Sequence, residues 1–377
     1  PITHYDPAAQ KVKLAAEVKG FDPEALLGRQ EAKRMGRFTQ FAVAAAREAL
    51  ADAGLSAAQV DPDRWGVIIS SGIGGQAITE AEHSRGLEKG FDRVSPFYVP
   101  TAICNMAAGQ VAIDAGFRAM CSCPVTACAG GTNAVGDAFH YIRDGYADVM
   151  LCGGTESAVT PLAIGAFTSM KALTQNPDPK RASIPFDAER SGFVLGEGAA
   201  ILLLEELEHA KARGARILAE VVGYGATCDA YHMTAPRPDG SGAAKAMEMA
   251  LADGGAKPED VDYINAHGTS TPLNDAGETA AVKTVFGDHA YKLAISSTKS
   301  MTGHMLGAAG AVEAMFCAMA LHDGYLPATI NYQVPDPACD LDVVPGHGRS
   351  ADVRYAMSNS LGFGGHNGSL LFKRWEA

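Results

Sequence analysis

Apolar and polar residues along the chain form short apolar runs that alternate with longer, helix-like stretches. The stretch FAVAAAREAL, which continues to LADAG at 50–54, has the small and apolar residues of a packed helix, and the strand-like run VIIS follows at 67–70. The runs MLCGG and AAILLLEE are apolar throughout rather than alternating, which is typical of strands covered on both faces. The pattern therefore predicts an α/β fold in which helices cover buried sheets.

This order of elements occurs twice. In the second half a similar helix, AAKAMEMA, continues to LADGG at 251–255 and leads to VDYIN at 261–265. PVTA runs into Cys128 and a helix that ends near Asp144, and AISSTKS runs into Gly307 and a helix that ends near Asp323, with the same spacing of sixteen residues. One such pair of short Ala- and Gly-rich words could arise by chance. Two pairs in the same order favour a duplicated α/β unit with a pseudo-twofold axis.

The duplication also predicts where a site would lie. The loops that follow the first repeated strand read SGIGG in one half and AHGTST in the other, and the strand-to-helix turns contain Cys128 and follow His304. A pseudo-twofold axis would bring these four loops together. We therefore expect one compact unit, with a site drawn from both halves and a junction near EELEHAKARGA, around 205–215.

Composition and charge narrow the class of protein. The formal net charge of −12 argues against a general nucleic-acid-binding protein. A local basic patch could still attract an acidic partner, because charges act over about 8 Å at physiological salt. No apolar run approaches the roughly 18 residues of a membrane span, and the start, PITHYDPAAQ, does not resemble a signal peptide. Eight cysteines without a CxxC pair are too sparse for a disulfide framework, so we expect reduced thiols and a cytoplasmic location.

The segment PVTACAGGTNAVGDAFHYI places Cys128 where a short strand meets a helix. A thiol at a helix N-terminus has a lowered pKa, because the free amides and the helix dipole favour the thiolate. Gly130 and Gly131 leave room for a ligand to approach the backbone. A buried cysteine in a tight turn is an equally good interpretation of this segment alone.

Two histidines and a glycine loop are further candidates. His267 follows a strand in INAHGTSTPLND, and His304 lies in SSTKSMTGHMLGAAGAVEAM with Lys299 five residues before it. Each histidine alone could be a satisfied polar residue at an element end, and the small residues after His304 could serve helix packing. The loop GFGGHNGS, residues 362–369, could offer backbone N–H groups to an oxyanion, and it lacks the GxxxxGK[ST] pattern of a phosphate-binding loop.

Together, TACAGG, NAHGTSTPLND, SSTKSMTGHMLGAAGAVE and NSLGFGGHNGS resemble, in this order and spacing, the β-ketoacyl-acyl carrier protein synthase family. The resemblance covers essentially the whole chain, including FDAERSGFVLGEGAAILLLEELEHAKARGA. SMTGH, in place of the NIGH of polyketide synthases, indicates fatty acid synthesis. The SGIGG loop with Ile73 is more similar to type II than to type I synthases.

The resemblance implies a thiolase-like fold of five layers, α/β/α/β/α, built from two pseudo-twofold halves. Residues 1–208 would form the half with the nucleophile, and residues 209–377 the half with the histidines, Lys299 and the glycine loop. The implied activity is acyl transfer, with elongation by decarboxylative Claisen condensation in fatty acid biosynthesis. A homodimer is implied, as is an acyl carrier protein that presents acyl and malonyl groups on phosphopantetheine. We expect no metal and no cofactor.

The resemblance also implies roles for single residues. Cys128 would take the acyl chain, His267 and His304 would donate hydrogen bonds to the malonyl thioester carbonyl, and Lys299 would orient His304. The amides of Cys128 and Phe363 would form the oxyanion hole. The remaining implied residues are those of the acyl pocket and its gate (Ile73, Ile103, Phe167, Phe363 and Gly364), of the pantetheine site (Thr269 and Thr271) and of carrier docking (Lys33, Arg34, Arg37 and Lys171).

Some features depart from the family pattern. The family usually begins with a further segment that contains a Val-rich strand, so we expect the first sheet here to lack a strand. Leu361 stands where Phe is frequent and His366 where Thr is common, and MCSCP precedes the nucleophile strand.

Three alternatives remain: a cysteine hydrolase, a non-catalytic partner subunit, and a thiolase-like or initiating enzyme acting on acyl-CoA. The pair of histidines argues against the first and third, and Cys128 argues against the second.

Overall fold

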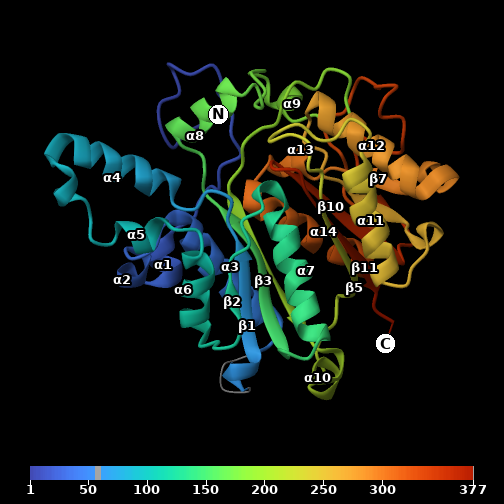
Figure 1. Cartoon of the computed structure of the whole chain (residues 1–377), viewed down its shortest axis with the longest axis horizontal. Helices are drawn as coiled ribbons and strands as arrows, with labels where there is room; N and C mark the ends of the chain where they lie inside the picture. The colour runs from blue at the N-terminus through green and yellow to red at the C-terminus, as the bar shows by residue number, and fades with distance from the viewer. Residues whose placement is uncertain (56–60, 377) are drawn as a thin grey trace.

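The computed structural model describes residues 1–55 and 61–376, and two mixed β-sheets form its framework (Figure 1). The first sheet has the order β2-β1-β3-β4, with β2 at Cys121–Ser122, β1 at Trp65–Ser70, β3 at Val149–Glu156 and β4 at Gly198–Glu205. The second has the order β7-β6-β10-β11-β5, with β7 at Ala294–Ser296, β6 at Tyr263–Asn265, β10 at Tyr355–Gly362, β11 at His366–Arg374 and β5 at Ala219–Cys228.

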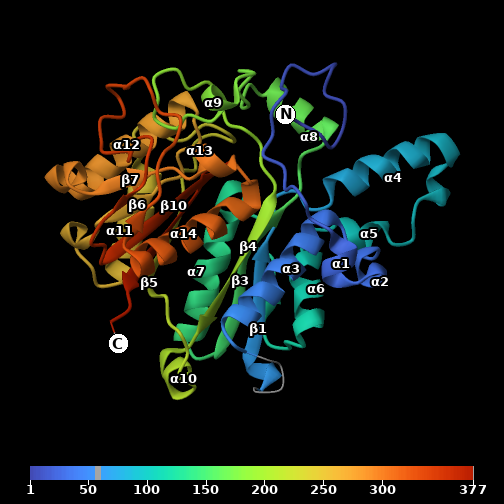
Figure 2. The same ribbon diagram turned by 180° about the vertical axis from the view of Figure 1, so that it is seen from behind.

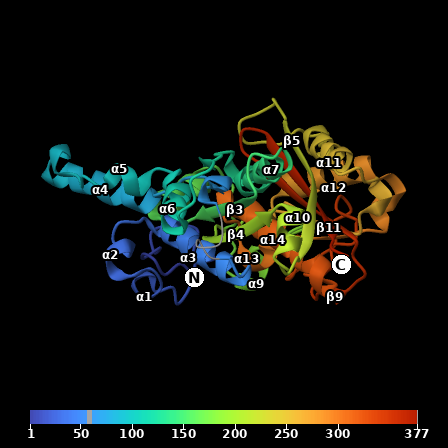
Figure 3. The same cartoon turned by 90° about the horizontal axis from the view of Figure 1, so that it is seen from below.

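Helices cover both sheets and separate them. The outer face of the first sheet carries α3 (Arg37–Asp52) and α6 (Met106–Ala115), and that of the second carries α11 (Ser241–Asp253) and α12 (Pro272–Phe286). Between the sheets lie α7 (Gly130–Arg143) and α14 (Ala309–Asp323), as Figure 3 shows from below. These are the five layers that the family resemblance implied.

Burial explains the apolar runs of the sequence. Every residue of β1 and of β3 is buried, as expected for strands with helices on both faces. The core between the sheets joins side chains of both halves, among them Ile68, Met150, Tyr263, Cys317 and Phe372. A separate cluster under α3 and α6 contains Trp65 and Phe38.

The predicted duplication is confirmed by the strand pairing. In the first sheet β1 runs parallel to β2 and β3, and β3 runs antiparallel to β4. In the second, β6 runs parallel to β7 and β10, and β10 runs antiparallel to β11. The helices α3 and α7 correspond to α11 and α14, in agreement with the repeated sequence words.

One strand of the second sheet, β5, has no counterpart among the described strands of the first sheet. β5 pairs antiparallel with the outer edge of β11, whereas no strand of the described residues pairs with the outer edge of β4. Among the described residues, the first sheet therefore has four strands and the second has five. The short helix α10 (Leu207–Ala212) connects β4 to β5, close to the predicted junction (Figure 2).

The remaining elements are short or peripheral. They are α1 (Pro23–Leu27), α2 (Arg29–Ala32), η2 (Pro62–Arg64), α4 (Gln76–Lys89), η3 (Phe91–Arg93), α5 (Tyr98–Ala102), η4 (Ala127–Ala129), α8 (Pro161–Ser169), α9 (Pro179–Ala182), η5 (Pro258–Asp260), η6 (Gly287–Tyr291), α13 (Lys299–Thr302), η7 (Leu306–Ala308), β8 (Tyr325–Leu326) and β9 (Arg349–Ser350). Of these, α4 extends away from the rest of the chain (Figures 1 and 2).

Among the described helices, none combines the length and the apolar character needed to cross a membrane. The same residues contain no group of three or more His, Cys, Asp or Glu side chains arranged to hold a metal ion.

Candidate active site

Cys128 lies in the turn between β2 and α7, at the boundary between the two halves. The turn is the short helix η4, and Ala127 within it has a φ of +48°, a conformation that residues other than glycine rarely adopt. The Cys128 side chain is buried against Phe193, Leu306 and Ile164. The strand-to-helix position predicted for this thiol is thus observed.

The electrostatics of Cys128 differ from the sequence-based expectation. Burial raises the pKa of the thiol to about 12, although the positive charge of Lys299 and the Phe363 N–H act to lower it. Burial therefore acts against the lowered pKa expected for a thiol at a helix N-terminus. The sequence alone could not show how completely this turn is enclosed.

His267 and His304 come together although they are far apart in the sequence. His267 follows β6 and His304 follows α13, and their ring centroids lie 5.3 Å apart with the rings nearly perpendicular. His304 also contacts the Phe193 ring, at 5.0 Å. Both histidines belong to the second half, whereas Phe193 and Cys128 belong to the first, so the site is drawn from both halves as predicted.

Both histidines are held in the neutral state. Burial, with the positive charge of Lys299, lowers the pKa of each ring well below its usual value, and His304 adds to the shift for His267. Neutral imidazole carries one N–H donor. The pair can therefore donate two hydrogen bonds to one ligand atom without holding a positive charge.

Lys299 is buried beside His267 rather than His304. Its ammonium group donates to the His267 carbonyl oxygen at 2.7 Å, lies 3.3 Å from His267 Nδ1, and forms an ion pair with Glu313. Among the described residues, His304 Nδ1 has no hydrogen-bond partner. The expected contact by which Lys299 orients His304 is thus replaced by a contact with His267, and its charge reaches His304 only through space.

Two buried carboxylates near the histidines were not among the predicted site residues. Glu278 accepts hydrogen bonds from the backbone N–H groups of His267 and Gly268, both at 2.8 Å, and fixes the loop after β6. Burial raises the pKa of Glu278 to about 7 and that of Glu313 also to about 7. Glu278 follows His267 by eleven residues on α12, and no local pattern in the sequence indicates that its side chain turns back to the loop.

The glycine loop closes the site from the second sheet. Gly362 ends β10 against the nucleophile turn, where a Cβ atom would lie 2.8 Å from the Thr126 oxygen and 3.3 Å from the Cys128 nitrogen. Phe363 follows, and its N–H acts on the Cys128 sulfur. Gly364 has a φ of +88° and donates its N–H to the Met233 carbonyl at 2.8 Å. The two N–H groups predicted for the oxyanion hole, those of Cys128 and Phe363, thus come from neighbouring turns.

The residues predicted for the acyl pocket separate into two groups. Ile73 and Phe167 pack against the cluster that contains Cys128, and Phe167 contacts Phe193 edge to face at 5.6 Å. Ile103, at the end of α5, is instead 43% exposed and lies outside this cluster. The structure therefore brings Ile73 and Phe167, but not Ile103, to the thiol of the same chain.

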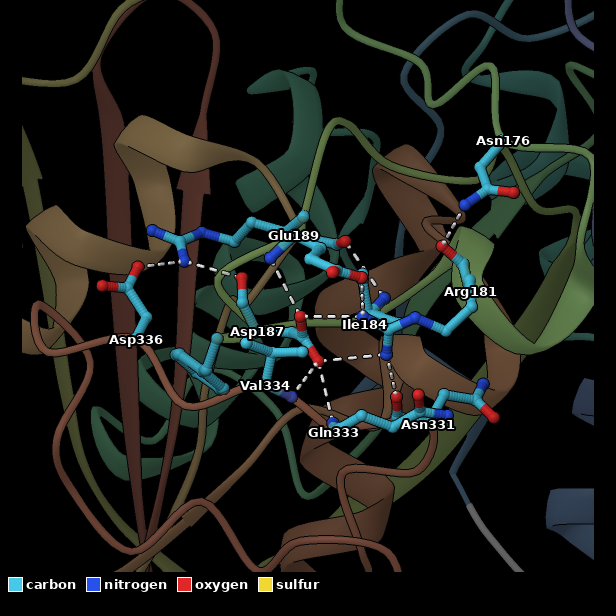
Figure 4. A network of polar contacts seen from close by, with 12 residues as sticks. Asn176, Arg181, Ile184, Asp187, Glu189, Asn331, Gln333, Val334 and Asp336 are labelled. Atoms are coloured by element: carbon cyan, nitrogen blue, oxygen red, sulfur yellow. Dashed lines mark hydrogen bonds and ion pairs between the residues drawn. The ribbon is translucent and has the colours of Figure 1, made fainter.

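The loop with Thr269 and Thr271 is joined to the polar network around Asp187 that Figure 4 shows, because Arg190 donates to the carbonyl oxygens of both Thr271 and Asp187. The two threonine hydroxyls lie 2.9 Å apart. Arg190 donates to the Thr271 and Pro272 carbonyls and pairs with Asp336. Sequence reasoning did not single out Arg190, although the FDAER segment that contains it was part of the resemblance.

Asp187 is the centre of the same network. Its carboxylate accepts hydrogen bonds from Arg181 and from the backbone N–H groups of Glu189, Gln333 and Val334. Although burial acts to raise its pKa, these donors lower the pKa of Asp187 to about 2. The segment before β4 is thereby tied to the loop that precedes β9, close to the loop with Thr269 and Thr271.

The four cations predicted for carrier docking have different surroundings. Lys33, Arg34 and Lys171 are exposed, whereas Arg37 forms an ion pair with Glu197 at 2.9 Å and lies over the Phe41 ring. Arg37 thus interacts with residues of its own chain. Of the four predicted cations, only Lys33, Arg34 and Lys171 remain candidates for binding an external partner.

Comparison with known proteins agrees with the fold and the site described above. Family models for the N-terminal and C-terminal domains of beta-ketoacyl synthases match residues 3–210 and 218–333. The 3-oxoacyl-[acyl-carrier-protein] synthase 2 of Synechocystis sp. is 54% identical over all of this chain and 91% of its own length. The enzyme of the same name from Staphylococcus aureus is 52% identical, with the same coverage of both chains.

Solved structures agree. The ishigamide ketosynthase/chain length factor has a TM-score of 0.93 and 39% identity, covering 100% of this chain and 91% of its own. A type II ketosynthase in complex with its acyl-carrier protein has a TM-score of 0.91 and 37% identity, covering 99% and 91%. The chain therefore belongs to the beta-ketoacyl synthase family, and it is an acyltransferase of the condensing type.

Proposed function

We propose that Cys128 accepts the acyl group in the first of two half-reactions. Its sulfur attacks the carbonyl carbon of an acyl thioester on acyl carrier protein, the bond from that carbon to the carrier sulfur breaks, and the carrier thiol leaves with the Cys128 proton. The N–H groups of Cys128 and Phe363 stabilise the oxyanion of the tetrahedral intermediate. One such donor is typically worth about 3–4 kcal/mol.

In the second half-reaction His267 and His304 act on a malonyl thioester of acyl carrier protein. They donate hydrogen bonds to its thioester carbonyl while the bond to the carboxylate breaks. The electron pair of that bond forms an enolate, and CO₂ leaves. The enolate carbon then attacks the acyl carbonyl on Cys128, whose sulfur leaves and regains a proton, and the product is a 3-oxoacyl thioester.

One observation carries this proposal: two neutral, buried histidines with ring centroids 5.3 Å apart lie in the same enclosed site as Cys128. Two neutral donors suit an enolate oxygen, because they stabilise developing negative charge without supplying an ionised base. A cysteine hydrolase would need one histidine to take a proton, and burial beside Lys299 opposes the positive charge that results.

The two half-reactions can be separated with Cys128→Gln, whose amide can occupy the oxyanion hole. This variant is expected to form no 3-oxoacyl product and still to release CO₂ from malonyl-carrier protein, measured as labelled CO₂. Adding His304→Ala should abolish the release. If folded Cys128→Gln protein releases no CO₂, the division of roles is wrong and His304 serves as the base for Cys128.

The exposed cations Lys33, Arg34 and Lys171 are the proposed docking site for acyl carrier protein. Carrier proteins are acidic and this chain has a net charge of −12, so attraction must be local. We expect Lys33→Glu/Arg34→Glu to weaken carrier binding and to reduce its salt dependence, while Cys128 keeps its reactivity towards a small thiol reagent. The control Lys257→Glu/Lys292→Glu makes the same change in net charge at two exposed lysines of the second half. Equal weakening of carrier binding in both variants would show that Lys33 and Arg34 do not form a specific docking site.

A homodimer is the proposed assembly, formed by the arm around α4 and α5. Large apolar side chains are exposed along it: Leu87, Phe91, Phe97, Val99, Ile103 and Ile113. Soluble monomers rarely expose an apolar surface of this extent, and Ile103 would reach an acyl pocket only through an assembly. Light scattering should give twice the chain mass, and Phe97→Asp should give monomers; a wild-type monomer would contradict the proposal.

We place the protein in the cytoplasm. All eight cysteines are free thiols, including the exposed Cys121 and Cys228, which suits a reducing compartment. Fractionation of the source cells with an antibody against the chain would test this location.

A further inference from the structure

Glu156 is a buried carboxylate without a role in the reaction proposed above. It is the last residue of β3 and is fully buried. Oxygen Oε2 accepts hydrogen bonds from the N–H groups of Gly72 at 2.7 Å and Gly307 at 3.0 Å. Oxygen Oε1 accepts from the Ile73 N–H and the Ser71 hydroxyl, both at 3.2 Å. An anion removed from water is tolerated only with such donors, and here three of the four are backbone N–H groups.

These donors come from both halves of the chain. Ser71, Gly72 and Ile73 form the loop after β1, and Gly307 lies in η7, immediately before α14. The two backbones touch, since a Cβ atom at Gly307 would lie 2.4 Å from the Gly72 nitrogen. The Glu156 carboxylate therefore holds the loop after β1, in the first half, against η7, in the second half.

What the carboxylate holds is the backbone of Ile73. The Ile73 side chain packs in the cluster that contains Cys128, Phe167, Phe193 and Leu306. Its N–H donates to Oε1 of Glu156, a side chain of another element, and is thereby tied to the end of β3. A small rotation of this peptide would move the Ile73 side chain along the pocket beside the thiol.

We propose that Glu156 is a positioning residue that sets the depth of the acyl pocket by holding Ile73 through its backbone N–H. The inference rests on the proposed role of the Cys128 cluster as the acyl site and adds a determinant of primer length that does not touch the primer. Glu156 is not a catalytic residue, because its hydrogen bonds are all with the loop and with η7.

The two oxygens of Glu156 allow a selective variant. In Glu156→Gln the amide oxygen satisfies two N–H donors best at the Oε2 position, facing Gly72 and Gly307. The NH₂ group then takes the Oε1 position, where it can donate to the Ser71 hydroxyl oxygen but faces the Ile73 N–H without an acceptor. The variant therefore keeps the contact between the halves and releases Ile73.

The experiment measures kcat/KM for a series of saturated acyl primers from short to long, with malonyl-carrier protein. For Glu156→Gln we expect the ratio of long to short primers to rise by about tenfold, the discrimination that a change of one methylene can cause in an apolar pocket. Malonyl decarboxylation should be unchanged, because His267 and His304 are not contacted. The control Glu197→Gln removes another buried carboxylate of the same half, which contacts Arg37 and not the loop, and should leave the ratio unchanged.

The outcomes separate the inference from the proposed function. The inference would be overturned if folded Glu156→Gln protein kept the wild-type ratio of kcat/KM for long and short primers, or lost activity equally at every primer length. Glu156 would then have a purely structural role. Wild-type protein that elongates no primer would instead overturn the proposed function. If Glu156→Gln does not fold, an amide-to-ester replacement at the Ile73 nitrogen removes only the N–H that donates to Oε1 and leaves the carboxylate in place; it should raise the ratio in the same direction, and no change there would also overturn the inference.

Discussion

The turn at Cys128 and the turn at Gly307 have the same backbone and different partners. Ala127 has a φ of +48° and Leu306 one of +46°, and each begins a short 3-10 helix that leads into α7 or α14. At the first turn the side chain is a thiol beside the Phe363 N–H. At the second the residue is glycine, and its N–H donates to the Glu156 carboxylate at 3.0 Å.

Under the proposed function, this difference is what makes one of two equivalent turns reactive. Backbone N–H groups at the start of a helix attract an anion wherever they occur. At Gly307 this capacity is used by a carboxylate of the chain itself, which ties the halves together. At Cys128 it faces the enclosed site, where a substrate oxyanion can accept the same kind of hydrogen bond. The duplicated backbone supplies the geometry, and the side chains decide which copy is available to substrate.

The largest effect should come from making the two turns alike. Cys128→Gly gives both turns a glycine and removes the nucleophile, so condensation should fall by at least about a thousandfold. Product formation from acyl- and malonyl-carrier protein checks this by mass spectrometry. The thermal transition should remain cooperative, and retained condensation would exclude Cys128 as the nucleophile.

A second effect should follow from widening the reactive turn. Gly362→Ala places a Cβ atom 2.8 Å from the Thr126 oxygen and 3.2 Å from the Ala129 nitrogen, so the Phe363 turn must move away from Cys128. Loss of one oxyanion donor should reduce kcat by about a hundredfold to a thousandfold. Single-turnover acylation of Cys128 measures the step directly. An unchanged acylation rate would remove Phe363 from the oxyanion hole.

A methyl group at the closed turn should reduce stability instead. Gly307→Ala places a Cβ atom 2.4 Å from the Gly72 nitrogen and 2.9 Å from Ser71, and overpacking of this kind costs about 1–3 kcal/mol in the free energy of unfolding. The control Gly277→Ala lies in α12 with no atom within 4 Å of the added Cβ, and should be neutral or stabilising by up to about 1 kcal/mol. Urea unfolding compares the two. Equal effects would show that the contact at Gly307 is not tight.

The charge near the reactive turn should set how readily the thiol ionises. Because burial raises the pKa of Cys128 to about 12, its alkylation rate by iodoacetamide should still increase between about pH 7 and pH 9 without a plateau. Lys299→Met removes a positive charge that lowers this pKa, so the pKa should rise further and alkylation at about pH 8 should slow by roughly tenfold, the equivalent of one pKa unit. Faster alkylation in Lys299→Met would contradict the assigned sign.

The smallest effect is expected at Ala127, the strained first residue of the turn at Cys128, and Leu306 at the equivalent position gives the comparison. Ala127→Gly removes a Cβ atom from a positive-φ position, which should gain up to about 1 kcal/mol after the entropy cost of glycine is counted. Leu306→Gly relieves the same strain but deletes a buried side chain of the Cys128 cluster, so it should lose about 2–4 kcal/mol. Thermal unfolding of both variants makes the comparison. Equal loss at the two positions would mean that φ is not a source of strain at Ala127.

Local pattern and repetition predicted much of the fold. The repeated words at 50–54 and 251–255 end the equivalent helices α3 and α11, and the strand pairing repeats in the two sheets as the duplication predicted. The convergence of the Cys128, His267 and His304 loops followed from the pseudo-twofold arrangement. Such features depend on sequence order, which one chain displays directly.

Contacts that depend on side-chain direction could not be predicted in the same way. Lys299 reaches His267 rather than His304, because α13 turns its side chain towards the loop after β6. The roles of Glu156 and Glu278 depend on buried backbone donors that come from distant loops. The raised pKa of Cys128 depends on burial by side chains that are distant in the sequence, such as Ile164, Phe193 and Leu306, which no local segment encodes.

The contact between α7 and α14 has a mechanical consequence. A Cβ atom at Gly131 would lie 2.6 Å from the Ala311 nitrogen, and one at Gly310 would lie 2.6 Å from the Thr132 nitrogen, so the two helix backbones are almost in contact. Helices this close cannot slide or rotate past one another without a collision of main-chain atoms. The two halves are therefore held as a single frame, and the close backbone contact opposes a hinge movement between them. Heat should likewise melt both halves in one calorimetric transition.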